Sequence, residues 1–345
     1  MTSVLRSRGT SRAAVSTVVS AVLAAGALTG TGAALADPAP APATLSGRTV
    51  FLDPGHQGSS AGHALNQQVP DGRGGTKDCQ TSGATSLFGE KKKEHTITWE
   101  VTQLVKAALE REGARVVLSR NDDTGWGGCV DERAAAAGAA RADLAVSVHA
   151  DSTSGKPDNG KSGFHLIVPK LPIPDAQVNS VQSGEGRKAS TTMRDAMVQA
   201  GFKPSNYTGS NGLQTRSDIA GANLTKVPLV FLEMGNLSNE KEANALSSAS
   251  GEAKYAVAIT NGIKSYLAGA PAAAAPGAEA PAPGAGLTDL ASLKAVEPLF
   301  DQLASAKSPE EAAGLLASLG PDVSAEVLKA MLSVVYTVFG GKLPI

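Results

Sequence analysis

The sequence predicts an α/β fold in which helices cover both faces of a mostly parallel, twisted sheet. Two observations support this prediction. Strand-like and helix-like segments alternate from about residue 48 to residue 267, the order expected of a helix-covered sheet. The strand-like segments are also nearly continuous apolar runs, which are typical of parallel strands buried on both faces.

Five short apolar segments have the composition of strands. They are residues 49–53 (TVFLD), 114–120 (ARVVLSR), 143–150 (DLAVSVHA), 163–169 (GFHLIVP) and 227–235 (VPLVFLEMG).

Four segments are predicted to be helices. The first covers residues 97–109, where apolar residues recur at helical spacing and form one stripe, namely Ile97, Val101, Leu104, Val105 and Ala108. The others are an Ala-rich segment at 131–141, a segment at 190–200 and a final helix at 242–267.

Residues 1–36 have the pattern of an export signal. Three arginines precede an apolar stretch at 13–35, which ends in the small-residue pattern ALA before Asp37; signal peptidase requires such a pattern. An uncleaved membrane anchor is the alternative, but Ser, Thr and Gly interrupt the stretch too often for a good spanning helix. We therefore predict a secreted or cell-envelope protein with no stable membrane span after cleavage.

Composition divides the rest of the chain into four parts. A Pro/Ala spacer at 37–47 precedes a catalytic domain at 48–267. A flexible Pro/Ala/Gly linker at 268–286 then leads to a small helical module at 287–345, whose role the sequence does not specify. The formal net charge of −1 gives no indication of a nucleic-acid partner, and we expect a monomer.

The only two cysteines, Cys79 and Cys129, are predicted to form a disulfide. In an exported protein two cysteines favour a bridge over a metal pair or a nucleophile. Two free buried thiols are the alternative. The bridge would stabilise the long, Gly-rich loop at 57–93 by closing a loop of about 50 residues.

Three ionisable residues come at the ends of apolar strands: His56, His149 and Glu233. In open α/β sheets the carboxyl ends of parallel strands form the edge where ligands bind. Because unpaired buried charge is costly, three such groups at one edge indicate a functional site rather than an ordinary core.

Two histidines and a carboxylate suit a catalytic zinc, which takes three protein ligands and leaves one position open. Glu94 is the best third ligand, because it lies one helical turn before the buried stripe. Glu90 is the alternative, although the lysines at 91–93 make it more typical of a loop charge. Glu233 is then available to transfer a proton.

At this point the chain resembles a known family, the zinc-dependent N-acetylmuramoyl-L-alanine amidases of the amidase-3 type, and within it the actinobacterial, mycobacterial-like peptidoglycan amidases. The similarity runs from about residue 49 to 267 through the motifs LDPGHQG, EHTITWEVTQLVKAALEREGARVVLSR, DERAAAAGAARADLAVSVHADS and VPLVFLEMGNLSN. The resemblance implies one Zn²⁺ per chain on His56, Glu94 and His149, with Glu233 as the catalytic residue. It also implies cleavage of the amide between N-acetylmuramic acid and L-alanine in peptidoglycan or muropeptides.

Two other functions remain open. A zinc peptidase acting on the stem peptide would use the same metal and the same proton-transfer group. A non-catalytic wall-binding protein could keep the fold, although such a domain is expected to lose a ligand or the last glutamate.

Three further residues are candidates for the site. Asp53 could orient the His56 ring or cap the turn beside it. Arg120 and Arg216 could bind a substrate carboxylate, with a structural ion pair at the surface as the favoured alternative for both.

The other histidines have simpler interpretations. His63 is predicted to be solvated in a loop, His95 to point off the buried stripe, and His165 to be a structural histidine with its hydrogen bonds satisfied.

Overall fold

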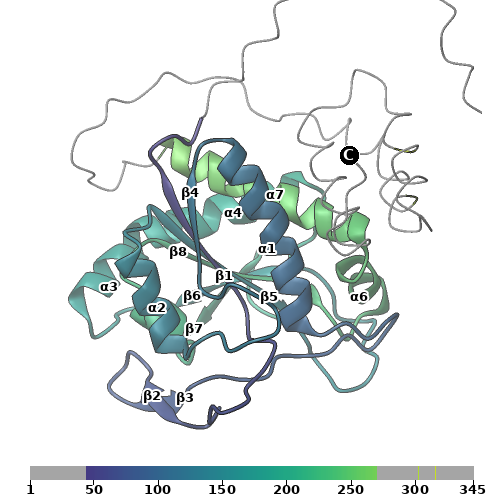
Figure 1. Cartoon of the computed structure of the whole chain (residues 1–345), viewed down its shortest axis with the longest axis horizontal. Helices are drawn as coiled ribbons and strands as arrows, with labels where there is room; N and C mark the ends of the chain where they lie inside the picture. Colours follow the sequence, from purple (N-terminus) through teal and green to yellow (C-terminus); the bar gives the residue numbers. More distant parts are fainter. Residues whose placement is uncertain (1–43, 270–301, 303–314, 316–345) are drawn as a thin grey trace, which may run out of the picture. The chain divides into compact units, whose positions relative to one another are not determined.

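The computed structural model describes residues 44–269, together with the single positions 302 and 315. Its centre is a six-stranded sheet in the order β4-β1-β5-β8-β6-β7 (Figure 1). The strands are β1 (Thr49–Pro54), β4 (Arg115–Leu118), β5 (Leu144–Asp151), β6 (His165–Pro169), β7 (Leu213–Arg216) and β8 (Leu229–Asn236). The predicted α/β class is confirmed, and the five predicted strands are present.

All but one of the pairings in this sheet are parallel. The exception is β6, which runs antiparallel to β8 and parallel to β7. The chain passes from β5 to β6 through a loop without a crossover helix, whereas parallel neighbours need a long crossover, usually a helix. The β6–β7 connection does contain helices, namely α3 (Ala176–Val181), the π-helical turn η1 (Gln182–Gly186) and α4 (Arg187–Gln199).

One face of the sheet forms the main core. Alternate residues of the central strands point to it, for example Val146 and Val148 of β5 and Leu232 of β8, each at most 1% exposed. Three helices cover this face: α1 (Glu94–Arg111), α4 and α7 (Ala249–Gly269). On α1 the fully buried apolar residues are Ile97, Val101, Val105 and Leu109, spaced by four residues as a single helical stripe requires.

The opposite face of the sheet is packed much less fully. Its apolar cluster is built largely from small residues, with Phe51 and Leu229 as the larger members. Two short helices cover it, α2 (Val130–Ala139) and α5 (Ala220–Leu224). Further along β1, β5 and β8 this face carries polar residues, namely Asp53, Ser147, His149 and Glu233, so the sheet has one packing face and one face available for chemistry.

The C-terminal helical segment differs from the prediction of one helix at 242–267. It consists of α6 (Glu240–Leu246) and α7, separated at Ser247 and Ser248. Ser248 explains the second start, because its hydroxyl accepts a hydrogen bond from the amide of Gly251 at 3.2 Å. Serine is a preferred residue at helix N-termini for this reason.

A two-stranded hairpin lies apart from the main sheet (Figure 1). It consists of β2 (Gln68–Pro70) and β3 (Thr76–Asp78), which the sequence analysis missed. At its tip, Arg73 donates to the main-chain carbonyls of Lys170, Pro172 and Ser217. The hairpin is therefore attached to the loops that follow β6 and β7.

The predicted disulfide is present and joins Cys79, directly after β3, to Cys129, the N-cap residue of α2. Both cysteines are buried and pack with Val69 of the hairpin. The bridge thus connects the hairpin to the helix on the second face of the sheet.

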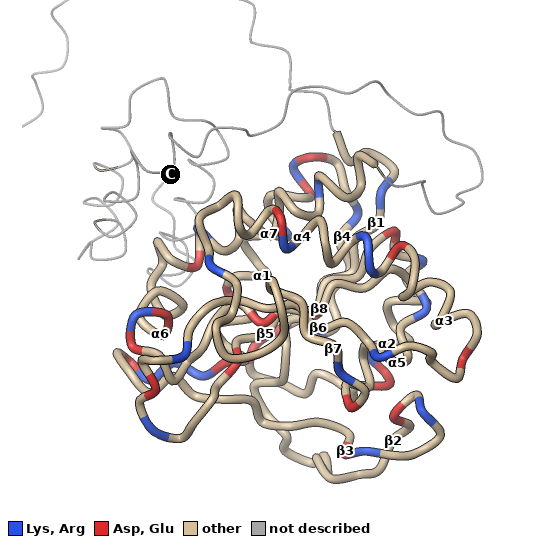
Figure 2. Tube along the Cα trace, turned by 180° about the vertical axis from the view of Figure 1, so that it is seen from behind, with Lys and Arg blue, Asp and Glu red and all other residues tan. Residues whose placement is uncertain are grey.

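The predicted export signal and most of the predicted linker and C-terminal module lie outside the described residues. Within the described part, no helix is both long and apolar enough to cross a membrane. Figure 2 shows acidic and basic residues interspersed along the described trace, including the hairpin.

Reduction of the Cys79–Cys129 bond is expected to lower the melting temperature. The bridge closes a 50-residue separation, and the chain-entropy model assigns such a loop about 4 kcal/mol. Thermal unfolding with and without reductant measures the effect, with thiol titration to confirm reduction. The Cys79→Ser, Cys129→Ser double variant is the control, since its melting temperature should not respond to reductant. An unchanged melting temperature of the fully reduced native protein would contradict the prediction.

Candidate metal centre

His56 lies in a tight turn directly after β1. Its φ of +62° is in the left-handed region, which non-glycine residues seldom adopt. The preceding Gly55 is required by close packing, because a Cβ there would lie 2.5 Å from the ring of His149. The turn is held from α2 by Arg133, which donates to the carbonyls of Pro54 and His56.

Glu94 is the first residue of α1, and its carboxylate is buried among partners from three other segments of the chain. One oxygen accepts from the amide of Ala84 at 2.7 Å. The other accepts from the amide of Ala150 at 3.1 Å and lies 3.0 Å from His56 Nε2 and 3.2 Å from His149 Nδ1. The carboxylate therefore connects the two imidazoles.

His149 belongs to β5 and points to the less packed face of the sheet. Its ring stacks on Phe231 of β8, with centroids 4.5 Å apart and an interplanar angle of 9°. It meets the ring of His56 edge-on at 4.9 Å. These contacts hold the imidazole against the end of the sheet.

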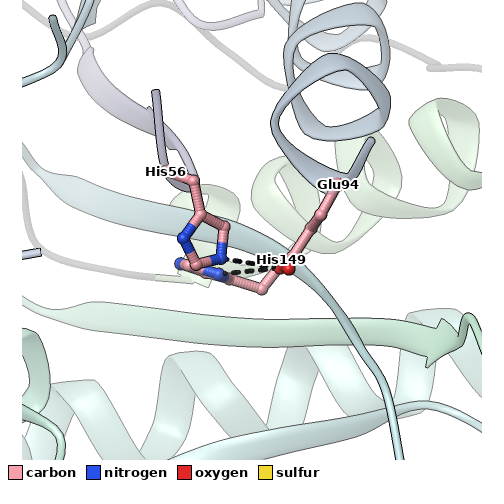
Figure 3. A group of neighbouring side chains, drawn as sticks. All are labelled: His56, Glu94 and His149. Atoms are coloured by element: carbon pink, nitrogen blue, oxygen red, sulfur yellow. Dashed lines mark hydrogen bonds and ion pairs between the residues drawn. The ribbon is translucent and has the colours of Figure 1, made fainter. Parts of the chain in front are cut away.

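The three side chains fit a metal ion. One ligand atom from each of His56, Glu94 and His149 lies within 4.8 Å of the other two (Figure 3). Two imidazoles and one carboxylate are a typical ligand set for catalytic zinc. The Nδ1 atom of His56 lies 3.2 Å from the carbonyl of Thr81; such a bond leaves Nε2 directed inward as the ligand.

The charges in this group stabilise one another. Burial disfavours the ionised carboxylate of Glu94, but His56 and His149 outweigh it and lower its pKa. Burial also opposes the charged form of His56, yet the adjacent Glu94 raises its pKa overall. For His149 burial prevails and lowers the pKa, which favours the neutral imidazole that metal binding needs.

Glu233 of β8 lies directly across the strand pairing from His149. Its Oε2 atom is buried and has no hydrogen-bond partner in the part of the chain that the structure describes. Burial, together with the charges of Glu94 and Asp151, raises its pKa well above the usual value. A carboxyl group of this kind can hold a proton near neutral pH, as general acids do.

A cavity of about 910 Å³ opens beside these four residues. It extends from the three candidate ligands and Glu233 beneath the hairpin towards α2 and α5. Polar and apolar groups both line it, including Asp53, Lys77, Ser147, Phe231 and Ile219. The space is large enough for an extended polar substrate.

Asp53 does not contact the ring of His56 in the described hydrogen bonds. Instead it accepts from Arg133 at 2.8 Å and from Ser147 at 2.7 Å. Burial would raise the pKa of Asp53, but these partners lower it to about 2. Asp53 therefore helps to hold the backbone of His56 indirectly, because it binds the Arg133 guanidinium that donates to the His56 carbonyl. The sequence analysis missed Arg133, although a charged residue within an Ala-rich helix was a signal that could have identified it.

Arg120 forms a structural ion pair with Asp123, as the alternative to substrate binding predicted, but the pair is not at the surface. Arg120 is 3% exposed, and its guanidinium donates to the carbonyls of Pro54 and His95 and to the carboxylate of Asp123. These bonds give Arg120 a structural role, because they hold its side chain beneath the turn that follows β1.

Arg216 ends β7 and forms a two-pronged ion pair with Asp218, at 2.9 and 2.5 Å. Its side chain is 35% exposed and does not line the cavity. Its role in substrate binding remains a prediction.

The remaining predicted residues lie outside the metal group. Glu90 is exposed in the loop before α1. His95 lies outside the group, as predicted, but it is buried, and its Nδ1 lies 2.7 Å from Asp123. His63 is exposed and stacks on Trp126 at 4.2 Å.

His165 also differs from its prediction. It was expected to be a structural histidine with satisfied hydrogen bonds, but its Nδ1 atom is buried without a partner among the described residues.

Comparisons with known proteins agree with this geometry. A family model described as N-acetylmuramoyl-L-alanine amidase matches residues 50–265. An N-acetylmuramoyl-L-alanine amidase of Mycobacterium tuberculosis is 42% identical over 227 residues, which cover 66% of this chain and 89% of that protein.

Two solved structures give the same result. The crystal structure of the N-acetylmuramyl-L-alanine amidase Ami1 of Mycobacterium smegmatis is 40% identical, with a TM-score of 0.61, and the match covers 66% of this chain and 100% of that one. The apo form of Ami1 of Mycobacterium abscessus is also 40% identical, with a TM-score of 0.59 over 64% of this chain and 99% of that one. This chain therefore belongs to the N-acetylmuramoyl-L-alanine amidase family.

Proposed function

We propose that this protein is an exported zinc hydrolase that cleaves the amide bond between N-acetylmuramic acid and the L-alanine of the peptidoglycan stem peptide. The observation that supports this most directly is the convergence of His56, Glu94 and His149 beside the buried carboxyl group of Glu233. Membership of the amidase family supports the choice of bond.

Zinc is the metal that suits the three ligands. Held there, it would polarise the amide carbonyl and make a water molecule more acidic. The protein contributes orientation: Thr81 fixes the His56 ring, Phe231 stacks on His149, and the amides of Ala84 and Ala150 hold the Glu94 carboxylate. Ligands fixed in this way lose little entropy on metal binding.

Glu233 is proposed to transfer the protons of the reaction. As a carboxylate it takes a proton from the attacking water, and it then gives that proton to the nitrogen of the leaving L-alanine. Its raised pKa suits the second step, because a proton held near neutral pH is readily donated. Its place on β8 next to β5 puts this carboxyl group beside the metal ligands.

The location and domain plan are also proposals. Residues 1–36 would direct export, residues 48–267 would form the catalytic domain, and residues 287–345 would be a helical module attached through the linker at 268–286. The disulfide supports an oxidising compartment outside the cytoplasm. We propose that the protein acts as a monomer on peptidoglycan or muropeptides.

A defined muropeptide tests this function against the peptidase alternative. The purified protein is incubated with it, with and without a chelator, and the products are identified by mass. The proposal requires a free sugar and an intact stem peptide starting with L-alanine, and no products with chelator. Cleavage inside the stem peptide would identify a peptidase, and no cleavage with zinc bound would support a wall-binding protein.

Glu94→Ala is expected to lower the zinc content markedly, because it removes the ligand that contacts both imidazoles. Metal analysis of the purified variant measures this. Glu90→Ala is the matched control, since it removes a nearby exposed carboxylate, and it should keep zinc near one per chain. The assignment is wrong if Glu90→Ala loses zinc and Glu94→Ala does not.

Glu233→Gln is expected to lower turnover at least about 100-fold, since general acid–base assistance is worth about 10²–10⁴ in rate. The amide keeps the shape of the side chain but cannot carry the proton. Zinc content should stay near one per chain. Loss of zinc would make Glu233 a ligand, and full activity with zinc bound would exclude it from the reaction.

A chain that ends at Gly269, the last residue of α7, is expected to cleave soluble muropeptide at a rate similar to that of the full chain. The reason is that all four proposed site residues lie before this point. Steady-state rates of both chains measure the effect. A large loss of turnover in a folded, zinc-loaded truncated chain would show that the C-terminal residues contribute to catalysis.

A further inference from the structure

Three ionisable side chains form a row across neighbouring strands of the sheet. His149 of β5 pairs with Glu233 of β8, and Glu233 pairs in turn with His165 of β6. Residues directly opposite one another in neighbouring strands project to the same face. Cβ atoms of such antiparallel pairs are about 5 Å apart, so the His165 ring is within reach of the Glu233 carboxyl group.

His165 and Glu233 share an unusual property. His165 is 2% exposed, and its Nδ1 atom and the Oε2 atom of Glu233 are both buried without a hydrogen-bond partner in the described residues. Buried polar atoms nearly always have a partner, because an unpaired one is costly. Gln214 Oε1 of β7 is a further buried, unpaired acceptor, but the strand pairing places Glu233 directly opposite His165.

The surroundings of His165 exclude a direct contact with substrate. Glu233 lines the cavity and His165 does not, so the imidazole lies behind the carboxyl group. The ring meets Tyr207 edge-on at 6.1 Å, and the hydroxyl of Tyr207 is occupied by a 2.9 Å bond to Asp151. On the side of β7, the Oε1 atom of Gln214 is also buried without a partner among the described residues, and the Gln214 side chain acts on the ring to raise the pKa of His165, so Gln214 is a second acceptor available to an imidazole N–H.

We propose that His165 is a positioning residue for Glu233: its Nδ1–H donates to Glu233 Oε2, directly or through one water molecule, and holds the carboxylate towards the cavity. This inference rests on the proposed amidase function. Burial lowers the pKa of His165, which favours a neutral ring with a single N–H to donate.

The hydrogen bond from His165 to Glu233 is strongest while Glu233 is ionised. A carboxylate in this buried position has no other donor among the described hydrogen bonds, and a donor behind it fixes the direction of its other oxygen. Because this interaction orients the carboxylate that takes the proton from the attacking water and makes no contact with the substrate, its loss is expected to lower kcat and leave KM unchanged.

Three substitutions test the position of the N–H. Asn places an amide N–H near the Nδ1 position, Gln places it further out, and Leu removes it. His165→Leu and His165→Gln are expected to lower kcat about ten- to a hundredfold, the usual effect of losing a hydrogen bond to a charged group. His165→Asn should stay within a few-fold of the native protein. Zinc content and KM should not change in any of them.

A packing control separates this role from a structural one. Val168→Ala removes buried volume from the same strand, and is expected to lower the melting temperature while leaving kcat unchanged. If His165→Leu fails to fold, the comparison of Asn with Gln decides. Equal activity of these two variants, a rise in KM without a change in kcat, or loss of zinc would each overturn the inference.

A double-mutant cycle with Glu233→Gln completes the test. If His165 acts through Glu233, adding His165→Leu to Glu233→Gln should cause little further loss. Full additivity would overturn the inference. Failure of the proposed function would look different, because the native protein itself would then leave the sugar–peptide amide intact.

Discussion

The site depends on the hydrogen bonds and ion pairs that the buried carboxylate of Glu94 makes. A buried charge is tolerated only when it is fully paired and hydrogen-bonded. Its two oxygens use the amides of Ala84 and Ala150 and the rings of His56 and His149. Those partners come from the loop before α1, from β5 and from the turn after β1. The first residue of one helix thus fixes three separate parts of the chain around a single point.

The two faces of the sheet explain why this arrangement is stable. Alternation along each strand sends Val146 and Val148 into the main core and Ser147 and His149 to the opposite side. The first face is closed by three long helices, and the second by two short ones and a hairpin. Stability therefore comes mainly from one face, and the other keeps polar groups and open space.

Much of this was readable from the sequence, because apolar strands and the residues that end them are local patterns. His56, His149 and Glu233 each follow directly from such a pattern, and Glu94 follows from the phase of the buried stripe on α1. The sequence did not predict that β6 runs antiparallel to its neighbour β8. That direction depends on the order of the strands in the sheet, in which β8 lies between β5 and β6. The partners of Asp53 and Arg120 and the unpaired atom of His165 were hidden for the same reason. Apart from the pairing of Arg120 with Asp123, each depends on residues distant in the sequence, and no local period encodes it.

The hydrogen bonds that attach the hairpin determine which residues around it can be substituted during evolution. Arg73 binds the carbonyl oxygens of Lys170, Pro172 and Ser217 and makes no use of their side chains. Every residue type offers such a carbonyl. Positions 170 and 217 can therefore vary over generations without loosening the hairpin, provided that the path of the backbone is kept. The side chains at positions 170 and 217 are free to diversify while the wall of the cavity stays in place, whereas Asn223, whose side chain accepts from Arg73 at 3.2 Å, is constrained.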